Sequence, residues 1–562
     1  MTIYQVLPRL FGNRNVNPMF NGSLKQNGCG KLSAFTGLEL NEIKQMGFTH
    51  IWYTGLLEHA TQTDYSAFGI RKDHPAIVKG IAGSPYAIKD YYDIDPDLAD
   101  NVENRMAEFE ALVQRTHEAG LKVIIDFVPN HVAREYYSDT KPDGIEDLGA
   151  SDNKEMAFAA NNNFYYIPGQ AFQPNFELTD KKGQSYTEYP AKATGNDCFS
   201  AHPHRLDWYE TVKLNYGVDY LNSGKTHFDP VPDTWNKMLD ILRFWAGKKI
   251  DGFRCDMAEM VPVEFWEWAI PQVKEASPGI IFIAEVYNPG QYRNYLYKGK
   301  FDYLYDKVGL YDTLRLVMNG YKTADEITYC WQAVDDIQSK MLNFLENHDE
   351  QRIASDFFAG DPIKGRPALV VSATMNTNPF MVYFGQELGE RGMEEEGFSG
   401  RDGRTSIFDY WNLPVLDRPL SDAQKKLREY YTKIVQLCNQ SKAIRQGAFF
   451  DLMYANLWKK DFDSNKQYAF MRYLANELLL IVANFDDKTA DINLRIPPYA
   501  FEYFGISEGQ IGKAKDLLTG TRCSSHLRTD NVYPVHILAY NAVIIRFEIH
   551  KDKVIASSED YW

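Results

Sequence analysis

The sequence lacks any run of about 20 apolar residues, the length a helix needs to cross a bilayer, so we expect no membrane span. It is also short of positive charge. Its 60 Lys and Arg face 76 Asp and Glu, which leaves a net charge of −16. Nucleic acid and anionic membranes attract basic surfaces, and neither is therefore expected as a partner.

Cysteine is scarce, and its positions contain no CxxC pair. This wide spacing argues against zinc ligation and against a dense disulfide scaffold. We expect free, buried thiols at all six positions, namely Cys29, Cys198, Cys255, Cys330, Cys438 and Cys523.

The first residues, "MTIYQVLPRLFGN", lack the basic and apolar regions of a secretion signal and are typical of a strand followed by a turn. Two interpretations stay open. The protein is intracellular, or it is secreted or periplasmic and its signal is missing from this sequence. We expect a monomer.

The length of 562 residues exceeds what one hydrophobic core usually serves, so two or three domains are expected. Aromatic residues make up 14% of the chain, which is a high share. Most of them will pack in cores, but aromatic rings also stack on flat apolar faces such as those of sugar rings.

Apolar strands alternate with amphipathic segments up to about residue 440. The helices expected at 101–120 and 232–247 each end in Gly, as at a C-terminal cap. Such alternation predicts a parallel sheet covered on both faces, and eight strand–helix units favour a closed barrel with its active site at the carboxyl ends of the strands. The expected strands lie within 2–12, 48–57, 121–131, 249–259, 279–288, 301–310, 340–350 and 379–387.

Two intervals depart from this pattern. Residues 132–232 are rich in Asn, Asp, Gly, Pro and Tyr without a clean helix, as in a lid or cleft wall. After about residue 447, alternating strands follow one another with short turns and no helices. We therefore predict an α/β fold: a (β/α)8 TIM barrel (1–132 and 220–446), an irregular insertion domain after strand three (133–219) and a C-terminal antiparallel β-sandwich (447–562).

Polar side chains follow the apolar runs of four expected strands, where burial is expensive unless charges are paired. In a closed barrel they converge on one mouth. They are Asp126, Asn130 and His131 after strand three, Arg254 and Asp256 in strand four, Glu285 after strand five, and Asn347, His348 and Asp349 after strand seven.

The segment "IDGFRCD" (250–256) places a cation and an anion two positions apart. Because side chains alternate along a strand, Arg254 and Asp256 should share one face, with Phe253 and Cys255 packed on the other. Arg254 would then keep Asp256 ionised and oriented.

Three carboxylates, two histidines and an arginine in one pocket suit chemistry in which positive charge develops on the substrate. Glycoside hydrolysis fits, because its oxocarbenium-like transition state is flanked by two carboxyl groups. An ionised Asp256 would be the nucleophile. Glu285 follows the apolar run "IIFIA" and suits the general acid, whose pKa must be raised by burial or by a neighbouring anion.

Four segments resemble, in order, the signature regions of the alpha-amylase family of glycoside hydrolases. The resemblance extends to "IYQVLPRLFG" near the start, "YFGQELGE" (383–390) and "GRTSIFDYW" (403–411). The four segments are "DFVPNH" (126–131), "GFRCDMAE" (252–259), "AEVY" (284–287) and "ENHDEQR" (346–352).

This resemblance implies a retaining double displacement on α-linked glucose polymers such as starch or maltooligosaccharides. Asp256 matches the nucleophile, Glu285 the general acid/base, and Asp349 the third carboxylate, which stabilises the transition state. Substrate-binding roles fall to four further residues: His131, His348, Arg254 and Tyr86. Ser84 stands near Tyr86 where many members carry His.

The sequence departs from the family at its usual calcium site. Asn130 is present, but Lys213 in "VKLN" replaces an Asp, and Met260 replaces a His four residues past the nucleophile. A lysine there supplies a cation whose ammonium would take the oxygens of the ion. We therefore expect no calcium at that site and no other cofactor. The acidic run at 90–100 lacks the glycine and spacing of an EF-hand, and we interpret it as a solvated barrel loop.

Several alternatives stay open. Starch-degrading members often carry Lys-His where this chain has Glu259 and Met260, so leaving-group contacts must differ. The chain could be a transglycosylase, an α-glucosidase or an α-1,6-cleaving member with the same carboxylates. A non-catalytic glucan-binding protein is a distant alternative, since it predicts loss of a carboxylate. Trp208, in the insertion, either packs or lines the cleft.

Overall fold

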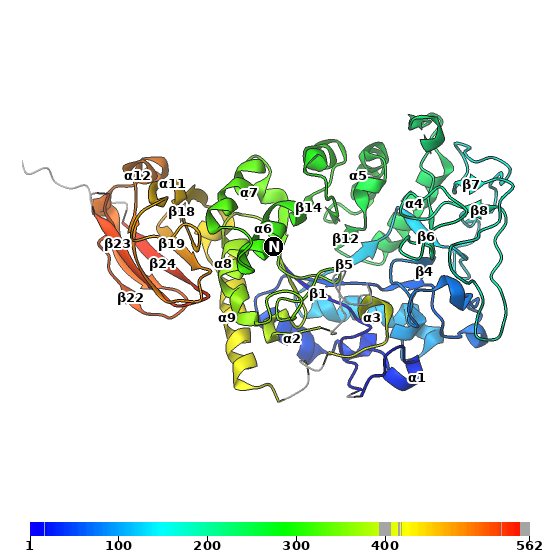
Figure 1. The fold of residues 1–562 in the computed structure, drawn as a ribbon, viewed down its shortest axis with the longest axis horizontal. Coiled ribbons are helices and arrows are strands. Elements are labelled where there is room, and N and C mark those ends of the chain that lie inside the picture. Colours follow the sequence, from blue (N-terminus) through cyan, green and yellow to red (C-terminus); the bar gives the residue numbers. More distant parts are fainter. Residues whose placement is uncertain (16, 393–405, 414–415, 417–418, 530, 551–562) are drawn as a thin grey trace, which may run out of the picture.

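The computed structural model describes residues 1–15, 17–392, 406–413, 416, 419–529 and 531–550. At its centre, eight parallel strands form a closed barrel (Figure 1). The last strand pairs with the first, so the predicted (β/α)8 barrel is confirmed, with strand six inside 301–310. In ring order the strands are β1 (Thr2–Val6), β2 (His50–Tyr53), β5 (Lys122–Phe127), β12 (Gly252–Cys255), β13 (Ile281–Ala284), β14 (Tyr303–Tyr305), β15 (Met341–Phe344) and β16 (Phe380–Tyr383).

Helices surround the barrel and bury one face against it. In α4, for example, Trp235, Leu239 and Leu242 are buried at the helical spacing of three to four residues. The helices of the barrel are α2 (Gly37–Gln45), α3 (Arg105–Glu118), α4 (Asp233–Gly247), α5 (Val263–Ala276), α6 (Asp312–Met318), α7 (Ile327–Ala333), α8 (Arg366–Thr374) and α9 (Asp422–Gln440).

Two details of the helix prediction are wrong. Between β13 and β14 no α-helix forms, and the chain makes only a short 3-10 turn and a π-helical turn at Asn294–Lys298. Gly247 is the last residue of α4 rather than its left-handed cap, and Lys249, with φ 64°, takes the left-handed conformation instead. Gly120, with φ 73°, does adopt that conformation after α3.

Three small antiparallel sheets follow β5, as expected of an insertion at this point. They lie at one end of the molecule, opposite the C-terminal sheet (Figure 1). The pairs are β6 (His131–Ala133) with β9 (Thr211–Lys213), β7 (Tyr166–Ile167) with β8 (Ala191–Lys192), and β10 (Val218–Asp219) with β11 (Lys225–Thr226). The boundaries 133–219 stay a prediction.

The acidic run at 90–100 is not a solvated loop, and that interpretation is wrong. It begins inside β4 (Ile88–Ile94), which pairs with β3 (Leu57–His59), and every residue of β4 is buried. Asp95 and Asp97 are also buried, and Asp95 caps the following 3-10 turn by accepting from the amide of Asp97. The period of two that marks a half-solvated strand is missing here, because both faces of β4 are covered.

The C-terminal part is an antiparallel sheet domain, as predicted. Two short helices, α11 (Met453–Asn456) and α12 (Pro498–Phe504), contradict the expectation that it holds none. Residues 551–562 of the predicted domain lie outside the described residues. The main sheet runs β17 (Ala448–Asp451), β18 (Gln467–Leu474), β19 (Glu477–Asn484), β24 (Asn541–Ile549), β21 (Ile511–Asp516) and β22 (Arg522–Cys523), and a second sheet pairs β20 (Ala490–Arg495) with β23 (Val532–Ile537).

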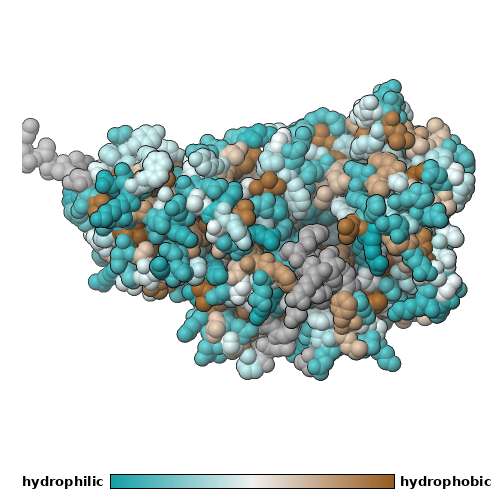
Figure 2. All heavy atoms as spheres, viewed as in Figure 1, coloured by the Kyte–Doolittle hydropathy of each residue, from teal (hydrophilic) through white to brown (hydrophobic). Residues whose placement is uncertain are grey.

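The C-terminal sheet is joined to the barrel by buried polar contacts. Asp451 accepts hydrogen bonds from Thr328 and from the indole of Trp331 on α7, each at 2.7 Å. Arg472 on β18 donates to the carbonyl of Thr374 at the end of α8. On the face seen in Figure 2, apolar residues form only small separate patches among hydrophilic ones.

The described residues bear on the predictions about membrane-spanning helices and about the cysteines. Among the described helices, none is long and apolar enough to span a membrane. The six cysteines are free, as expected, although only Cys255, Cys330 and Cys438 are buried and the other three are half-buried.

Candidate active site

A cleft of about 970 Å³ opens at the carboxyl ends of the barrel strands. The three predicted catalytic carboxyls, Asp256, Glu285 and Asp349, all line it, and they come from the ends of β12, β13 and β15. Tyr86 and His131 line it as well. Barrel closure is what brings these residues together, since they are far apart in the sequence.

Arg254 lies at the base of the carboxyl cluster. Its side chain is fully buried, and its NH1 is 2.6 Å from Oδ1 of Asp256 while its NH2 is 2.7 Å from Oε2 of Glu285. Strand alternation produces this arrangement, because Phe253 and Cys255 point to the other side and belong to the hydrophobic core between barrel and helices. One guanidinium therefore orients two of the three predicted catalytic carboxyls.

Glu285 has two further partners that the sequence did not indicate. The hydroxyl of Tyr287 donates to Oε1 at 2.6 Å, and the backbone N–H of Met257 donates to Oε2 at 2.8 Å. Met257 adopts a left-handed conformation with φ 43°, which is rare for a residue with a side chain. This turn directly after Asp256 aims the amide at Glu285.

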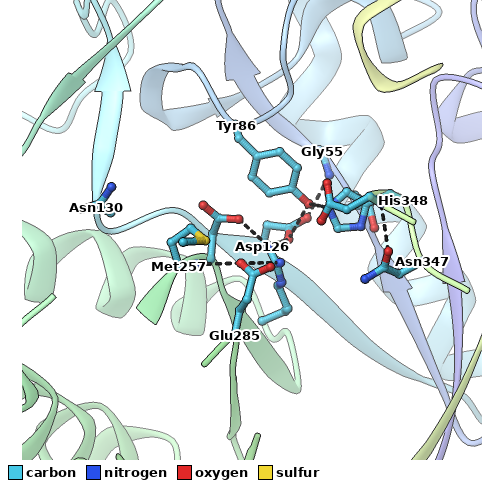
Figure 3. Close-up of polar contacts among 12 residues, drawn as sticks. Gly55, Tyr86, Asp126, Asn130, Met257, Glu285, Asn347 and His348 are labelled. Carbon is cyan, nitrogen blue, oxygen red and sulfur yellow. Dashed lines mark hydrogen bonds and ion pairs between the residues drawn. The ribbon is translucent and has the colours of Figure 1, made fainter. Parts of the chain in front are cut away.

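The third carboxyl, Asp349, lies beside an aromatic and histidine pair. Nε2 of His348 is 3.1 Å from Oδ2 of Asp349 and 2.6 Å from the hydroxyl of Tyr86. The rings of Tyr86 and His348 stack with centroids 5.2 Å apart. Figure 3 shows Tyr86 and His348 meeting close to Asp126.

Asp126 is a member of the cluster that the sequence placed at a strand end without a role. Its Oδ2 accepts from the indole of Trp52 at 3.2 Å and from the amide of Gly55 at 3.0 Å. Its Oδ1 lies 3.3 Å from the hydroxyl of Tyr86 and 3.5 Å from Arg254. Asp126 thus connects the arginine to the tyrosine behind the cleft wall.

The electrostatics of the cluster keep protons in it near neutral pH. Burial raises the pKa of Asp256 well above its ordinary value; Arg254 opposes this rise, and Glu285 and Asp349 add to it. Burial and the nearby Glu285 raise the pKa of Asp349 to about 8. Several buried carboxyls near one cation cannot all be ionised, so the cluster can supply a proton.

The two histidines are uncharged. Burial, followed by the nearby Lys213, lowers the pKa of His131 to about 3. Burial and Arg254 lower the pKa of His348 well below its ordinary value. Neither histidine therefore adds positive charge to this end of the barrel.

The predicted substrate-binding residues fall into two groups. Tyr86 and His131 border the cleft, whereas Arg254 and His348 are buried behind its wall. Of the two interpretations left open for Trp208, the structure favours the cleft: Trp208 lines it, and the centroid of its ring lies 5.3 Å from that of His131. The substrate-binding roles stay predictions.

Lys213 occupies the position at which the family resemblance would place calcium. Its ammonium is 2.5 Å from Oδ1 of Asn130, 2.6 Å from Oδ1 of Asp197 and 3.3 Å from the carbonyl of Met260. The antiparallel pairing of His131 with Lys213 between β6 and β9 brings the lysine there. Figure 3 shows Asn130 apart from the carboxyl cluster. The ammonium thus binds oxygens of Asn130, Asp197 and Met260, and the expected absence of calcium at this position stays a prediction.

Comparisons with known proteins agree with this geometry. Residues 5–410 match the family model described as the alpha amylase catalytic domain. The chain is 24% identical over 401 residues to alpha-amylase 3 of Dictyoglomus thermophilum, covering 64% of this chain and 68% of that protein. It is 20% identical over 513 residues to neopullulanase 2 of Thermoactinomyces vulgaris, covering 88% and 71%.

A solved structure extends the likeness over nearly the whole fold. The alpha-amylase of Geobacillus thermoleovorans, complexed with acarbose, superposes with a TM-score of 0.62 at 20% identity, covering 97% of this chain and 98% of that one. At this identity the superposition supports the fold: barrel, small sheets after β5 and C-terminal sheet. Part of the segment "GRTSIFDYW", at 403–405, lies outside the described residues.

Proposed function

Since the chain belongs to the alpha-amylase family of glycoside hydrolases, we propose that it hydrolyses α-1,4-glucosidic bonds in starch-type glucans or maltooligosaccharides with retention of configuration. The observation that carries this proposal is the bridging of Asp256 and Glu285 by Arg254, through ion pairs of 2.6 and 2.7 Å. A retaining enzyme needs its two carboxyls about 5 Å apart, and one guanidinium that holds both favours so short a separation.

Asp256 is the nucleophile in this proposal. It reacts in its ionised form, which Arg254 favours against the effect of burial. Arg254 holds its Oδ1, and no group in the described part of the chain donates a hydrogen bond to Oδ2, which leaves that oxygen for the sugar. In the first step, Oδ2 attacks the anomeric carbon and the bond to the leaving oxygen breaks. The leaving oxygen takes the proton of Glu285, and a covalent glycosyl ester on Asp256 results.

Glu285 acts in both steps. Once deprotonated, its carboxylate takes a proton from a water molecule, which attacks the anomeric carbon and releases Asp256. Tyr287 and the amide of Met257 fix the carboxyl in place, so that the same oxygen can face first the leaving group and then water. Asp349 completes the site as a third carboxyl that binds sugar hydroxyls and favours the positive transition state.

The cleft suits a glucan chain. Its wall carries Tyr86, Trp208 and Tyr287 between polar side chains, a mixture that binds both the apolar faces and the hydroxyls of sugar rings. Acarbose, the molecule named in the complex of the Geobacillus thermoleovorans relative, belongs to that protein. By analogy we place an oligosaccharide in the cleft of this chain.

We also propose that this enzyme works without calcium at the Asn130 position. The ammonium of Lys213 is buried with 2% exposure and already binds the oxygens of Asn130 and Asp197. It joins the insertion to β5 and the loop after β12, which is the connection that an ion would otherwise provide.

The test is a time course of products from amylose, pullulan and maltoheptaose, with the anomeric form of the first product followed by NMR. We expect α-configured maltooligosaccharides from amylose and maltoheptaose, and a loss of about 10⁴-fold or more in Asp256→Asn, because no ester can form. Exposed Asp422→Asn is the matched control.

Other outcomes separate the alternatives. Undiminished activity in Asp256→Asn would refute the mechanism, and a β-configured first product would refute retention. Release of glucose alone would indicate an α-glucosidase, products longer than the substrate a transglycosylase, and cleavage confined to pullulan an α-1,6-acting enzyme. Binding of maltoheptaose without any product would indicate a glucan-binding protein.

A further inference from the structure

A second group of acidic side chains meets outside the cleft, where the β3–β4 hairpin contacts the start of the insertion. Glu58 lies on β3 and is paired in register with Asp90 on β4, and Asp93 follows on the same strand. Asp139 lies in the segment after β6, and β6 itself packs against β4 (Figure 1). Carboxylate oxygens of Glu58, Asp93 and Asp139 lie within 4.8 Å of one another.

Glu58 sets this group apart from an ordinary acidic surface. Its residue is 1% exposed, and neither carboxylate oxygen has a hydrogen-bond partner among the described residues. A buried carboxylate with no donor at either oxygen is strongly unfavourable unless it binds a metal cation or takes up a proton. The two oxygens of Glu58 lie near the carboxylates of Asp93 and Asp139, which are negatively charged and cannot donate a hydrogen bond.

Nearby protein cations are committed to other anions. Lys89 lies 3.1 Å from Asp73, and Nε of Arg105 lies 2.8 Å from Oδ2 of Asp93. These pairs neutralise Asp73 and Asp93. Glu58, Asp90 and Asp139 form no ion pair with a lysine or arginine in the described part of the chain.

Asp90 accepts hydrogen bonds from neighbouring backbone and hydroxyl groups, and it forms no ion pair in the described part of the chain. Its Oδ2 accepts from the amide of Asp139 at 3.1 Å and from the hydroxyl of Thr140 at 3.2 Å, and its Oδ1 accepts from the amide of Tyr92 at 2.7 Å. These bonds hold the 139–140 backbone against β4. The Asp139 side chain is therefore placed close to Glu58 by a fixed loop.

We propose that Glu58, Asp93 and Asp139 bind a divalent cation, with calcium as the ion they fit best. The ligands are all oxygen, which hard cations prefer. Oδ2 of Asp93 accepts from Arg105, whereas Oδ1 accepts, among the described residues, only from the amide of Ile94 at 2.8 Å and so keeps a second lone pair for a metal. Calcium tolerates irregular geometry and completes its shell with water, which exposed Asp139 leaves room for, whereas magnesium requires a near-ideal octahedron.

The ion would tie the insertion to the barrel at a second point. Lys213 joins β9 to Asn130 near the cleft, and the acidic site would join the segment after β6 to β3 and β4. His131 begins β6 and lines the cleft. Removal of the ion should therefore loosen the cleft wall without removing a catalytic group.

The experiment uses the full chain, stripped with EDTA and returned to chelator-free buffer. We expect isothermal titration with CaCl₂ to give one site, and the Tm to rise with calcium concentration as ligand linkage requires. Calcium binding and the calcium-dependent Tm shift should both be lost in Glu58→Gln and in Asp139→Asn. Asp139 is exposed, so its variant keeps the test valid if Glu58→Gln does not fold.

Asp197→Asn is the matched control, because it removes a carboxylate from the Lys213 position and leaves the acidic site intact. Its calcium titration should equal that of the wild type. The proposal is overturned if the stripped wild type binds no calcium, if both Glu58→Gln and Asp139→Asn bind it as the wild type does, or if binding is lost only in Asp197→Asn. These readouts are binding and Tm, so they do not depend on the proposed hydrolase activity.

Discussion

At the scale of single residues, the site depends on how a few buried side chains share charge. Arg254 contacts Asp126, Asp256 and Glu285, which lie on or directly after three neighbouring strands. The planar guanidinium can do this because its donors point in fixed, divergent directions. A lysine would offer one point charge and could not hold two carboxyls in separate orientations.

Tyr287 is a positioning residue for Glu285. Replacement by Phe in Tyr287→Phe removes the 2.6 Å hydrogen bond to Oε1 and leaves the ring in place. We expect kcat to fall about 10- to 100-fold with little change in KM or Tm, since a misoriented acid weakens the transition state more than substrate binding. Exposed Tyr297→Phe is the control. A change in KM alone would mean that Tyr287 binds substrate instead.

Asp349 makes stability depend on pH. Burial and Glu285 raise its pKa to about 8, so its ionised form is disfavoured in the folded state. The stability that its protonated form contributes is present below about pH 4 and is lost as the pH rises through about 8.

In Asp349→Asn this loss should disappear. Urea titrations from pH 4 to 9 should show the free energy of unfolding of the variant gaining on that of the wild type by up to about 1.4 kcal/mol per pH unit until about pH 8. Asp422→Asn, which changes an exposed carboxyl, should follow the wild type. A constant difference between Asp349→Asn and the wild type across this range would contradict the assignment.

At the scale of elements, register and turn geometry deliver groups that no local pattern specifies. The pairing of β6 with β9 places Lys213 opposite His131, and the left-handed turn at Met257 points an amide at Glu285. The position of Lys213 and the direction of the Met257 amide both follow from where a strand ends rather than from which residues it contains. The first concerns the predicted cation position, and the second concerns the predicted catalytic acid.

Lys213→Asp tests the cation position at this scale. Without calcium, the variant sets a second carboxylate beside Asp197 and leaves Asn130 without its donor, so we expect a loss of about 2–4 kcal/mol in the free energy of unfolding. Added calcium should restore much of it, because an all-oxygen site is recreated.

Lys213→Met is the matched variant, since it removes the ammonium without supplying a ligand. Its Tm should be low and should respond to calcium no more than that of the wild type. If Lys213→Asp is as stable as the wild type in EDTA, the lysine does not replace an ion. Chemical denaturation with and without CaCl₂ measures both variants.

At the scale of the whole molecule, the C-terminal sheet is anchored to the barrel by a buried cation. Arg472 donates to the carbonyls of Thr374, Ile444 and Gly447, at 3.0, 2.9 and 2.8 Å. Burial lowers the pKa of Arg472 to about 9. The side chain therefore balances a desolvation penalty against three hydrogen bonds.

Arg472→Met should destabilise the protein by about 2 kcal/mol, because three buried carbonyls lose their donor and an unmade buried hydrogen bond costs more than a made one contributes. Thermal unfolding followed by calorimetry measures the change, with exposed Arg522→Met on the same sheet as control. Equal or greater stability in Arg472→Met would mean that desolvation of the cation outweighs its hydrogen bonds.

The sequence by itself determined the barrel and the strand ends at which the predicted catalytic carboxyls lie. Short apolar runs alternating with amphipathic helices specify parallel strands, because burial on both faces removes the polar alternation. A carboxylate directly after such a run can lie only at a strand end, which is why Asp256, Glu285 and Asp349 were located without a structure. Strand alternation likewise assigned Arg254 and Cys255 to opposite faces.

Only the tertiary structure decided which of these groups touch. Barrel closure and strand register set the contacts of Arg254 and Met257 with Glu285, because these residues come from the ends of two neighbouring strands. The same holds for the acidic run at 90–100, which looked solvated until β3 and the insertion covered it. Local periodicity reports the face that a residue occupies, but the partner across that face is fixed only when the elements pack.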